Sequence, residues 1–130
     1  VRLAENVTAQ FGIGMVDATL TATDEALPRI PPLKGTVRIT FPYKGFRLSP
    51  EWVLAARQDR VYRDETATDS YSVLNVRALF ALPTSSRNHL ITVSAFNLTN
   101  ELYRNHTSFI KDLAPEIGRG VKAGYTLRFF

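Results

Sequence analysis

The side chains that could carry chemistry in this sequence are few and lie mostly near its end. His106 is followed by Lys111, Asp112 and Glu116, and imidazole and carboxylate groups are common metal ligands. One histidine with carboxylates at these intervals lacks the spacing of a metal site, so His106 is a weak metal candidate and better interpreted as ordering a loop. In the same way, Lys111, Asp112 and Arg119 could contact a charged ligand, although loop ordering through ion pairs is the stronger interpretation.

Catalytic chemistry finds little support in the sequence. The chain has no cysteine, which excludes a disulfide scaffold, a cysteine-ligated metal site and a cysteine nucleophile. It also lacks a nucleophile elbow, a phosphate-binding glycine loop and an H-E-x-x-H motif. We therefore expect neither an enzyme nor a bound cofactor.

Length and composition fit one folded unit of ordinary size. The chain has 130 residues, 45% of them hydrophobic and 22% charged, which is not the composition of a disordered segment. Its net charge of +4 is spread over single Lys and Arg residues without a basic run. Signatures of nucleic-acid recognition modules are absent as well, so we expect no nucleic-acid partner.

The elements that position these side chains are predicted by an alternation of apolar and polar residues. A period of two residues indicates β-strands, and no segment shows a helical period. Successive strands with turns between them predict an antiparallel meander of about six long strands. The alternating segments are 6–22, 34–43, 45–62, 70–82, 88–97 and 118–130.

The connections between these segments alternate between short and long. The short ones, 42–45 and 83–88, are rich in turn residues, and the long ones are 23–34, 63–70 and 102–119. Transmembrane β-barrels typically have short turns at one end of the sheet and long loops at the other. Their strands are also longer than those of most soluble proteins. A soluble all-β binding or structural domain, folded as a two-sheet sandwich, remains the alternative because it alternates too.

The stretch from Phe96 to Phe130 resembles the C-terminal end of TonB-dependent outer-membrane receptors. Its segments "NLTNELYR", "HTSFIKDLAPEIGR" and the closing strand ending in Phe follow that family's pattern, and "LPRIPPLKG" resembles another recurrent segment. The matching residues are Asn97, Leu98, Asn100, Tyr103, Arg104, His106, Ser108, Lys111, Asp112, Ala114, Pro115, Gly118 and Arg119.

This resemblance implies that residues 1–130 form the C-terminal segment of a barrel of about 22 strands with a plug domain in its lumen. The plug and the earlier strands would belong to a longer chain. The implied function is energy-coupled uptake of a scarce nutrient (a siderophore, a metal, cobalamin, haem or a glycan) across a Gram-negative outer membrane. The implied partners are membrane lipid and lipopolysaccharide, the plug and remaining strands, the TonB system, the outer-membrane assembly machinery and a small-molecule ligand not identified by the sequence.

The resemblance also implies a direction for the chain. The C-terminus would be periplasmic and the long loops extracellular, which makes Arg104, His106, Lys111, Asp112 and Arg119 candidates for an outer-loop site. The apolar faces would meet lipid, while a polar set would line the lumen: Arg38, Arg47, Glu51, Arg57, Asn75, Arg77, Lys122 and Arg128.

The end of the chain has the form of an outer-membrane assembly signal, carried by Tyr125, Leu127, Phe129 and Phe130. Such barrels resemble one another in closing on an aromatic residue of the lipid-facing set. Here Phe130 falls out of phase with Tyr125, Leu127 and Phe129. Either Phe129 takes the usual role, or a bulge shifts the register near the end.

Overall fold

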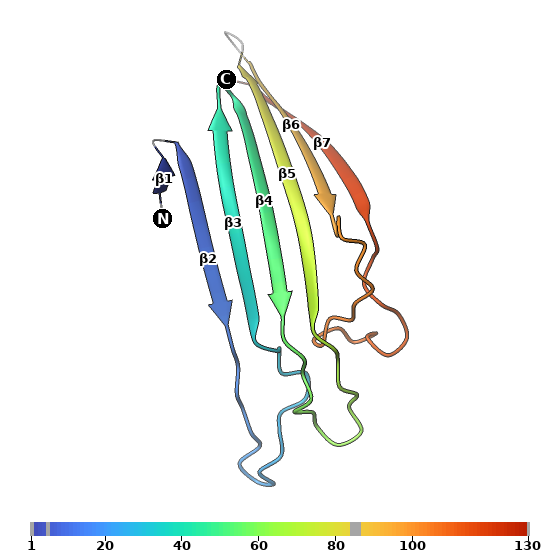
Figure 1. Ribbon diagram of the computed structural model, residues 1–130. Helices are drawn as coiled ribbons and strands as arrows, with labels where there is room; N and C mark the ends of the chain where they lie inside the picture. Colours follow the sequence, from blue (N-terminus) through green and yellow to red (C-terminus); the bar gives the residue numbers. More distant parts are fainter. Residues whose placement is uncertain (1, 5, 84–86, 130) are drawn as a thin grey trace.

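The protein is a single antiparallel sheet in which every strand pairs with its neighbour in sequence, as Figure 1 shows. The computed structural model describes residues 2–4, 6–83 and 87–129. Its strands are β1 (Arg2–Ala4), β2 (Val7–Gly14), β3 (Lys34–Tyr43), β4 (Phe46–Ala55), β5 (Tyr71–Pro83), β6 (Arg87–Phe96) and β7 (Gly120–Phe129). The predicted meander of six long strands is confirmed, with the three-residue β1 added at one edge.

Two strands end earlier than the alternation predicted. β2 stops at Gly14, because the chain then turns back on itself with a bridge between Thr19 and Ala26. β4 stops at Ala55, after which the backbone N–H of Ala56 donates to the Leu33 carbonyl, and the pairing with the β5 side continues only as an isolated bridge between Gln58 and Thr68. The loops are therefore longer than expected and span residues 15–33, 56–70 and 97–119, here named the first, second and third loops.

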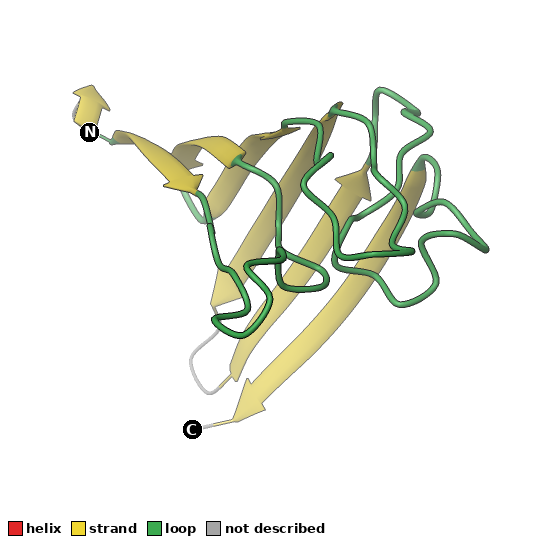
Figure 2. Cartoon of the chain, turned by 90° about the horizontal axis from the view of Figure 1, so that it is seen from below, coloured by secondary structure: helices red, strands yellow, loops and turns green. Residues whose placement is uncertain are grey.

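Short turns and long loops lie at opposite ends of the sheet. The predicted turn between β3 and β4 is confirmed: Lys44 and Gly45 both have positive φ, 40° and 82°, as a two-residue hairpin turn requires. A Cβ at Gly45 would lie 2.7 Å from the Ala81 carbonyl oxygen, so only glycine fits. The other predicted short turn includes residues 84–86, which lie outside the described residues. The three long loops gather at the other end (Figures 1 and 2).

The strand register divides the side chains into two faces, since residues paired across strands point to the same side. One face, named the apolar face, carries mainly apolar side chains, namely Ala9, Phe11, Ile13, Val37, Ile39, Phe41, Tyr43, Phe46, Leu48, Trp52, Leu54, Leu74, Val76, Ala78, Phe80, Ile91, Val93, Ala95, Val121, Ala123, Tyr125, Leu127 and Phe129. Two polar residues, Ser72 and His89, also lie on it. The other, named the polar face, carries Thr8, Gln10, Lys34, Thr36, Arg38, Thr40, Arg47, Ser49, Glu51, Asn75, Arg77, Thr92, Ser94, Lys122, Thr126 and Arg128. The predicted inward set lies on the polar face except for Arg57, which follows β4 in the second loop.

The apolar face has no second layer against it among the described residues. All described strands belong to one sheet, and Phe11, Trp52 and Tyr125 on this face are 68%, 47% and 60% exposed. A two-sheet sandwich would bury such side chains, so the sandwich alternative is wrong for this part of the chain. The small buried core lies instead at the loop end, around Tyr71 and Val73.

No described segment forms a helix of the length and apolar character needed to cross a membrane.

Candidate functional site

The three long loops are joined to one another by side-chain contacts at the loop end of the sheet. Gln58 of the second loop donates through Nε2 to the Ile30 carbonyl of the first at 3.0 Å, and Arg63 pairs with Glu25 at 3.3 Å. The Arg29 guanidinium of the first loop lies 3.7 Å from the ring centre of Phe109 in the third loop. Loops from three different hairpins therefore form one contiguous structure, and Figure 2 shows them together in front of the sheet.

Glu65 of the second loop is the centre of this structure. Both of its carboxylate oxygens accept from the backbone N–H of Arg29 at 3.1 Å, and Oε1 accepts from the Lys111 ammonium at 3.1 Å. Burial alone would raise the pKa of the Glu65 carboxyl. Donation by Arg29, Lys111 and the backbone N–H of Tyr62 outweighs burial and lowers that pKa below its ordinary 4.5. Glu65 is therefore an anion that accepts hydrogen bonds from residues of all three loops: the first, the third and its own second loop.

His106 and Lys111 of the third loop are buried beside Glu65, with exposed fractions of 1% and 3%. The Lys111 ammonium donates to the Thr66 carbonyl at 2.7 Å and lies 3.4 Å from His106 Nδ1. The Thr68 hydroxyl also contacts Nδ1, at 3.0 Å. Since an ammonium can only donate, Nδ1 must be an acceptor, which puts the imidazole proton on Nε2, 3.4 Å from Glu65 Oε1.

The electrostatics of the cluster favour a neutral histidine. Burial lowers the pKa of His106 below its ordinary 6.5, and the Lys111 ammonium lowers it further. The carboxylates of Glu65 and Asp112 act in the opposite direction and offset only part of these effects. We name Glu65, Thr68, His106 and Lys111 the loop cluster.

The structure brings together four of the five residues predicted for an outer-loop site. The Arg104 guanidinium donates to the Lys111 carbonyl, and Asp112 accepts a hydrogen bond from the Thr66 hydroxyl. His106 and Lys111 lie in the loop cluster. Arg119, the last residue of the third loop, stands apart: its backbone N–H donates to Asn100 Oδ1 at 3.2 Å and the residue is exposed.

The surroundings of His106 do not suit a metal ion. The described residues contain no group of three or more His, Cys, Asp or Glu side chains placed to hold one. The Lys111 ammonium next to Nδ1 would repel a cation, and Thr68 already contacts the same lone pair. What this arrangement can do is hold three loops in one conformation.

Sequence reasoning missed the partners of the third loop. Glu65 and Thr68 belong to no motif or spacing that marks them in the sequence. Glu65 and Lys111 are 46 positions apart, and no periodicity or motif links them. Only the loop positions, each following a strand end at the same rim, could have indicated that these segments meet.

Asn97 fixes the base of the third loop and is 2% exposed. Its Nδ2 donates to the carbonyls of Glu101 at 2.9 Å and Ile117 at 3.2 Å, and its Oδ1 accepts from the Glu101 N–H at 2.8 Å. Its backbone is left-handed, with φ of 48°, which asparagine tolerates better than most residues. The two ends of the third loop are thereby tied together where the loop leaves the sheet.

Near the closing strand, Tyr125, Leu127 and Phe129 all lie on the apolar face. The register between β6 and β7 runs without interruption from Phe96 and Gly120 to Arg87 and Phe129, so the bulge considered as an alternative is absent from the described residues. The apolar face therefore reaches Phe129, which is 68% exposed. Phe130 lies outside the described residues.

Comparison with known proteins supports the architecture. No protein-family model and no curated protein sequence matches this chain. Among solved structures, the copper transporter OprC is similar, with a TM-score of 0.77 and 20% identity over 98% of this chain. This chain covers 21% of that protein. The described sheet thus has the fold of a segment of that transporter, and the predicted antiparallel meander is confirmed.

Proposed function

We propose that this chain is the C-terminal barrel segment of a receptor that takes up a scarce nutrient across a Gram-negative outer membrane, coupled to the TonB system. One observation carries the proposal: a single curved sheet has a continuous apolar face and a continuous polar face across six long strands. A soluble sheet covers its apolar face, whereas a membrane barrel turns that face to lipid.

The strand lengths fit this placement. A strand of 10 residues, such as β3 or β7, is about 33 Å long at roughly 3.3 Å per residue. Tilted by about 40°, it rises about 25 Å, the height of the apolar band of an outer-membrane barrel. The apolar face would meet lipid and lipopolysaccharide, and the polar face a lumen closed by a plug and by further strands of the receptor.

The difference between the two ends of the sheet supports one orientation in the membrane. Long loops are extracellular in outer-membrane barrels and short turns are periplasmic. The loop cluster would then order the extracellular mouth, and the C-terminus would be periplasmic and available to the assembly machinery. The strands would form part of the barrel wall of a transporter and the loops part of its extracellular opening, and the chain would catalyse no reaction.

The proposal also concerns the identity of the transported nutrient. OprC is a copper transporter, so copper is the first cargo to test among siderophores, metals, cobalamin, haem and glycans. Uptake of each labelled nutrient by a deletion strain, with and without the full-length gene, identifies it. Loss of uptake in a strain lacking TonB is the expected sign of energy coupling.

These 130 residues contain no cysteine, so single cysteines introduced here into a cysteine-free form of the full-length receptor test the orientation. In the full-length receptor, cysteine at Leu113, which is 84% exposed in the third loop, should react with a membrane-impermeant maleimide on intact cells. Cysteine at Lys44, in the β3–β4 turn, should react only after the outer membrane is permeabilised. Labelling of both sites on intact cells, or of neither, would overturn the orientation.

A further inference from the structure

The polar face carries more positive charge than its own carboxylates can neutralise. Within the described residues of β2–β7, Glu51 is the one acidic side chain on this face, and it pairs with Arg38. Arg47, Arg77 and Lys122 lie on the same face, and their side chains make no hydrogen bond or ion pair with any described residue. Cations left unpaired on a concave, partly enclosed wall attract anions more strongly than cations on an open surface.

The register places two of these cations on either side of a hydroxyl. Arg77 of β5 pairs with Ser94 of β6, which pairs with Lys122 of β7. Because neighbouring strands are about 4.8 Å apart, the Cα atoms of Arg77 and Lys122 are separated by about 10 Å, with the Ser94 side chain between them. Side chains as long as those of arginine and lysine can converge over that serine.

Space for a ligand lies on the turn side of this row. The next row toward the short turns contains Leu79, Thr92 and Gly124. A Cβ placed on Gly124 would meet no atom within 4 Å, so the sheet surface beside Lys122 is open. On the loop side the Phe96 ring covers Gly120, where a Cβ would lie 2.3 Å from the ring, and this forms an apolar wall.

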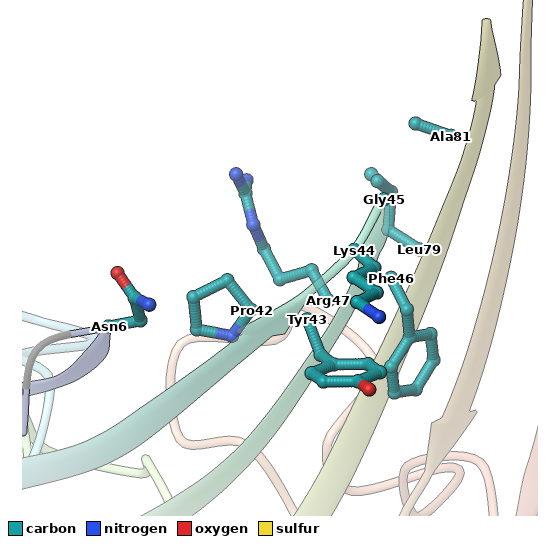
Figure 3. Close-up of a pocket in the computed structure, with 9 residues that line it drawn as sticks. All are labelled: Asn6, Pro42, Tyr43, Lys44, Gly45, Phe46, Arg47, Leu79 and Ala81. Atoms are coloured by element: carbon teal, nitrogen blue, oxygen red, sulfur yellow. The ribbon is translucent and has the colours of Figure 1, made fainter.

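Arg47 borders the same open area from β4. It pairs with Leu79, one row from Arg77 on the adjacent strand. It also lines a cavity of about 350 Å³ together with Lys44 and Leu79. Figure 3 shows the Arg47 guanidinium on the side opposite the Tyr43 and Phe46 rings, so the cation extends from the polar face while those rings extend from the apolar face.

We propose that Arg47, Arg77 and Lys122, with the hydroxyls of Thr92 and Ser94, form a binding site on the polar face for an anion that carries carboxylate or phosphate groups. Guanidinium groups bind both groups through two parallel hydrogen bonds, and the hydroxyls add neutral donors. The inference rests on the proposed function, which makes this face the wall of a lumen. Carboxylates could come from a free solute or from acidic side chains of another part of the receptor.

The test compares matched variants of the purified full-length receptor in detergent at low ionic strength. Citrate and inorganic pyrophosphate serve as probes, with affinity measured by calorimetry. Arg77→Gln combined with Lys122→Gln should weaken binding of the probes by at least about tenfold, since two charged hydrogen-bond donors are lost. Lys34→Gln removes a positive charge from the same face at the loop end of β3 and should leave the affinity within about twofold.

The two sources of carboxylate give different results. If acidic side chains of the receptor occupy the site, citrate does not bind the wild type, and the double variant lowers the melting temperature more than Lys34→Gln does. If the double variant does not differ from Lys34→Gln in probe affinity or in melting temperature, the site does not exist. Heat-modifiable migration of the same samples on gels reports barrel assembly separately, so its loss would count against the proposed function and not against the anion site.

Discussion

The Lys111 ammonium lies 3.1 Å from Glu65 Oε1, and this contact ties the third loop to the second across 46 positions of sequence. The same carboxylate accepts from the backbone N–H of Arg29 in the first loop. The Glu65 carboxylate thus links the first, second and third loops. Each loop is held by a hydrogen bond or ion pair to a residue of another loop. A barrel mouth built in this way should respond as a unit when one member is changed.

Replacing Lys111 by Met should loosen all three loops. The substitution keeps the length of the side chain and leaves the Glu65 carboxylate, 11% exposed, without its cation. Removing one partner of a buried ion pair costs about 3–5 kcal/mol, which should appear as a lower free energy of loop opening. Amide hydrogen exchange of residues 103–116 in the full receptor measures it. Arg119→Met, which changes an exposed cation of the same loop, is the control; equal exchange in the two variants would contradict the prediction.

The loop cluster should open as the pH falls from about 6.5 toward 4.5. The pKa of His106 is lowered from 6.5 in the closed loops, so below pH 6.5 the opened form binds a proton more readily and gains stability relative to the closed form. Above pH 6.5 both forms hold a neutral imidazole and this effect vanishes. The contribution of Glu65, whose pKa is lowered from 4.5, is lost only below about pH 4.5.

Hydrogen exchange in the third loop at pH 5.5 and 7.5, corrected for intrinsic rates, measures this dependence. The wild-type loop should be less protected at pH 5.5, whereas His106→Gln should show the same protection at both pH values. A wild-type loop equally protected at both would refute the neutral histidine assigned from its contacts with Lys111 and Thr68.

Asn97→Ala should separate the two ends of the third loop from the sheet. The change removes the donor to the Glu101 and Ile117 carbonyls and places alanine at a φ of 48°, which costs about 1–2 kcal/mol by itself. With the lost hydrogen bonds, we expect a total near 2–3 kcal/mol. Limited proteolysis of the assembled receptor should cut the third loop faster. Asn105→Ala, which removes only bonds to Thr107, should leave the cleavage rate unchanged.

The strands and their faces could be predicted because both depend on local sequence. Alternation is a property of neighbouring residues, and it gave the six long strands, the meander and the polar placement of Arg38, Glu51 and Arg77. The strand ends were less predictable. After Ala55 the alternation continues in sequence, but the backbone of Ala56 bonds to Leu33 of the first loop and only one bridge, between Gln58 and Thr68, follows.

Only two of the four residues of the loop cluster could be predicted from the sequence. His106 and Lys111 are close in sequence and stand out together, whereas their partners Glu65 and Thr68 come from another hairpin. Which loop residues meet depends on the path of each loop above the rim, and no periodic pattern governs that path. Lys111 and Asp112 both contact the second loop, and the loop-ordering role expected for them stays a prediction.

A charge on the apolar face should harm barrel stability far more than the same charge on the polar face. Ile39 and Thr40 are adjacent in the middle of β3 and point to opposite faces. In the assembled receptor, Ile39→Arg should lower the free energy of unfolding by about 2–4 kcal/mol, the cost of an arginine facing lipid. Thr40→Arg should have a small effect because it faces the lumen. Guanidinium unfolding of the two variants in lipid vesicles measures the difference, and equal losses would mean that the apolar face does not meet lipid.

Phe129 should be the aromatic residue that matters for assembly. The uninterrupted β6–β7 register puts Phe129 on the apolar face with Tyr125 and Leu127, whereas Arg128 lies on the polar face. We therefore expect Phe129→Ala to reduce the heat-modifiable fraction of the receptor in outer membranes, and removal of both Phe129 and Phe130 to reduce it further. Arg128→Ala, one residue away on the other face, is the matched control. Normal assembly of the variant that lacks both phenylalanines would show that the end of this strand carries no assembly signal.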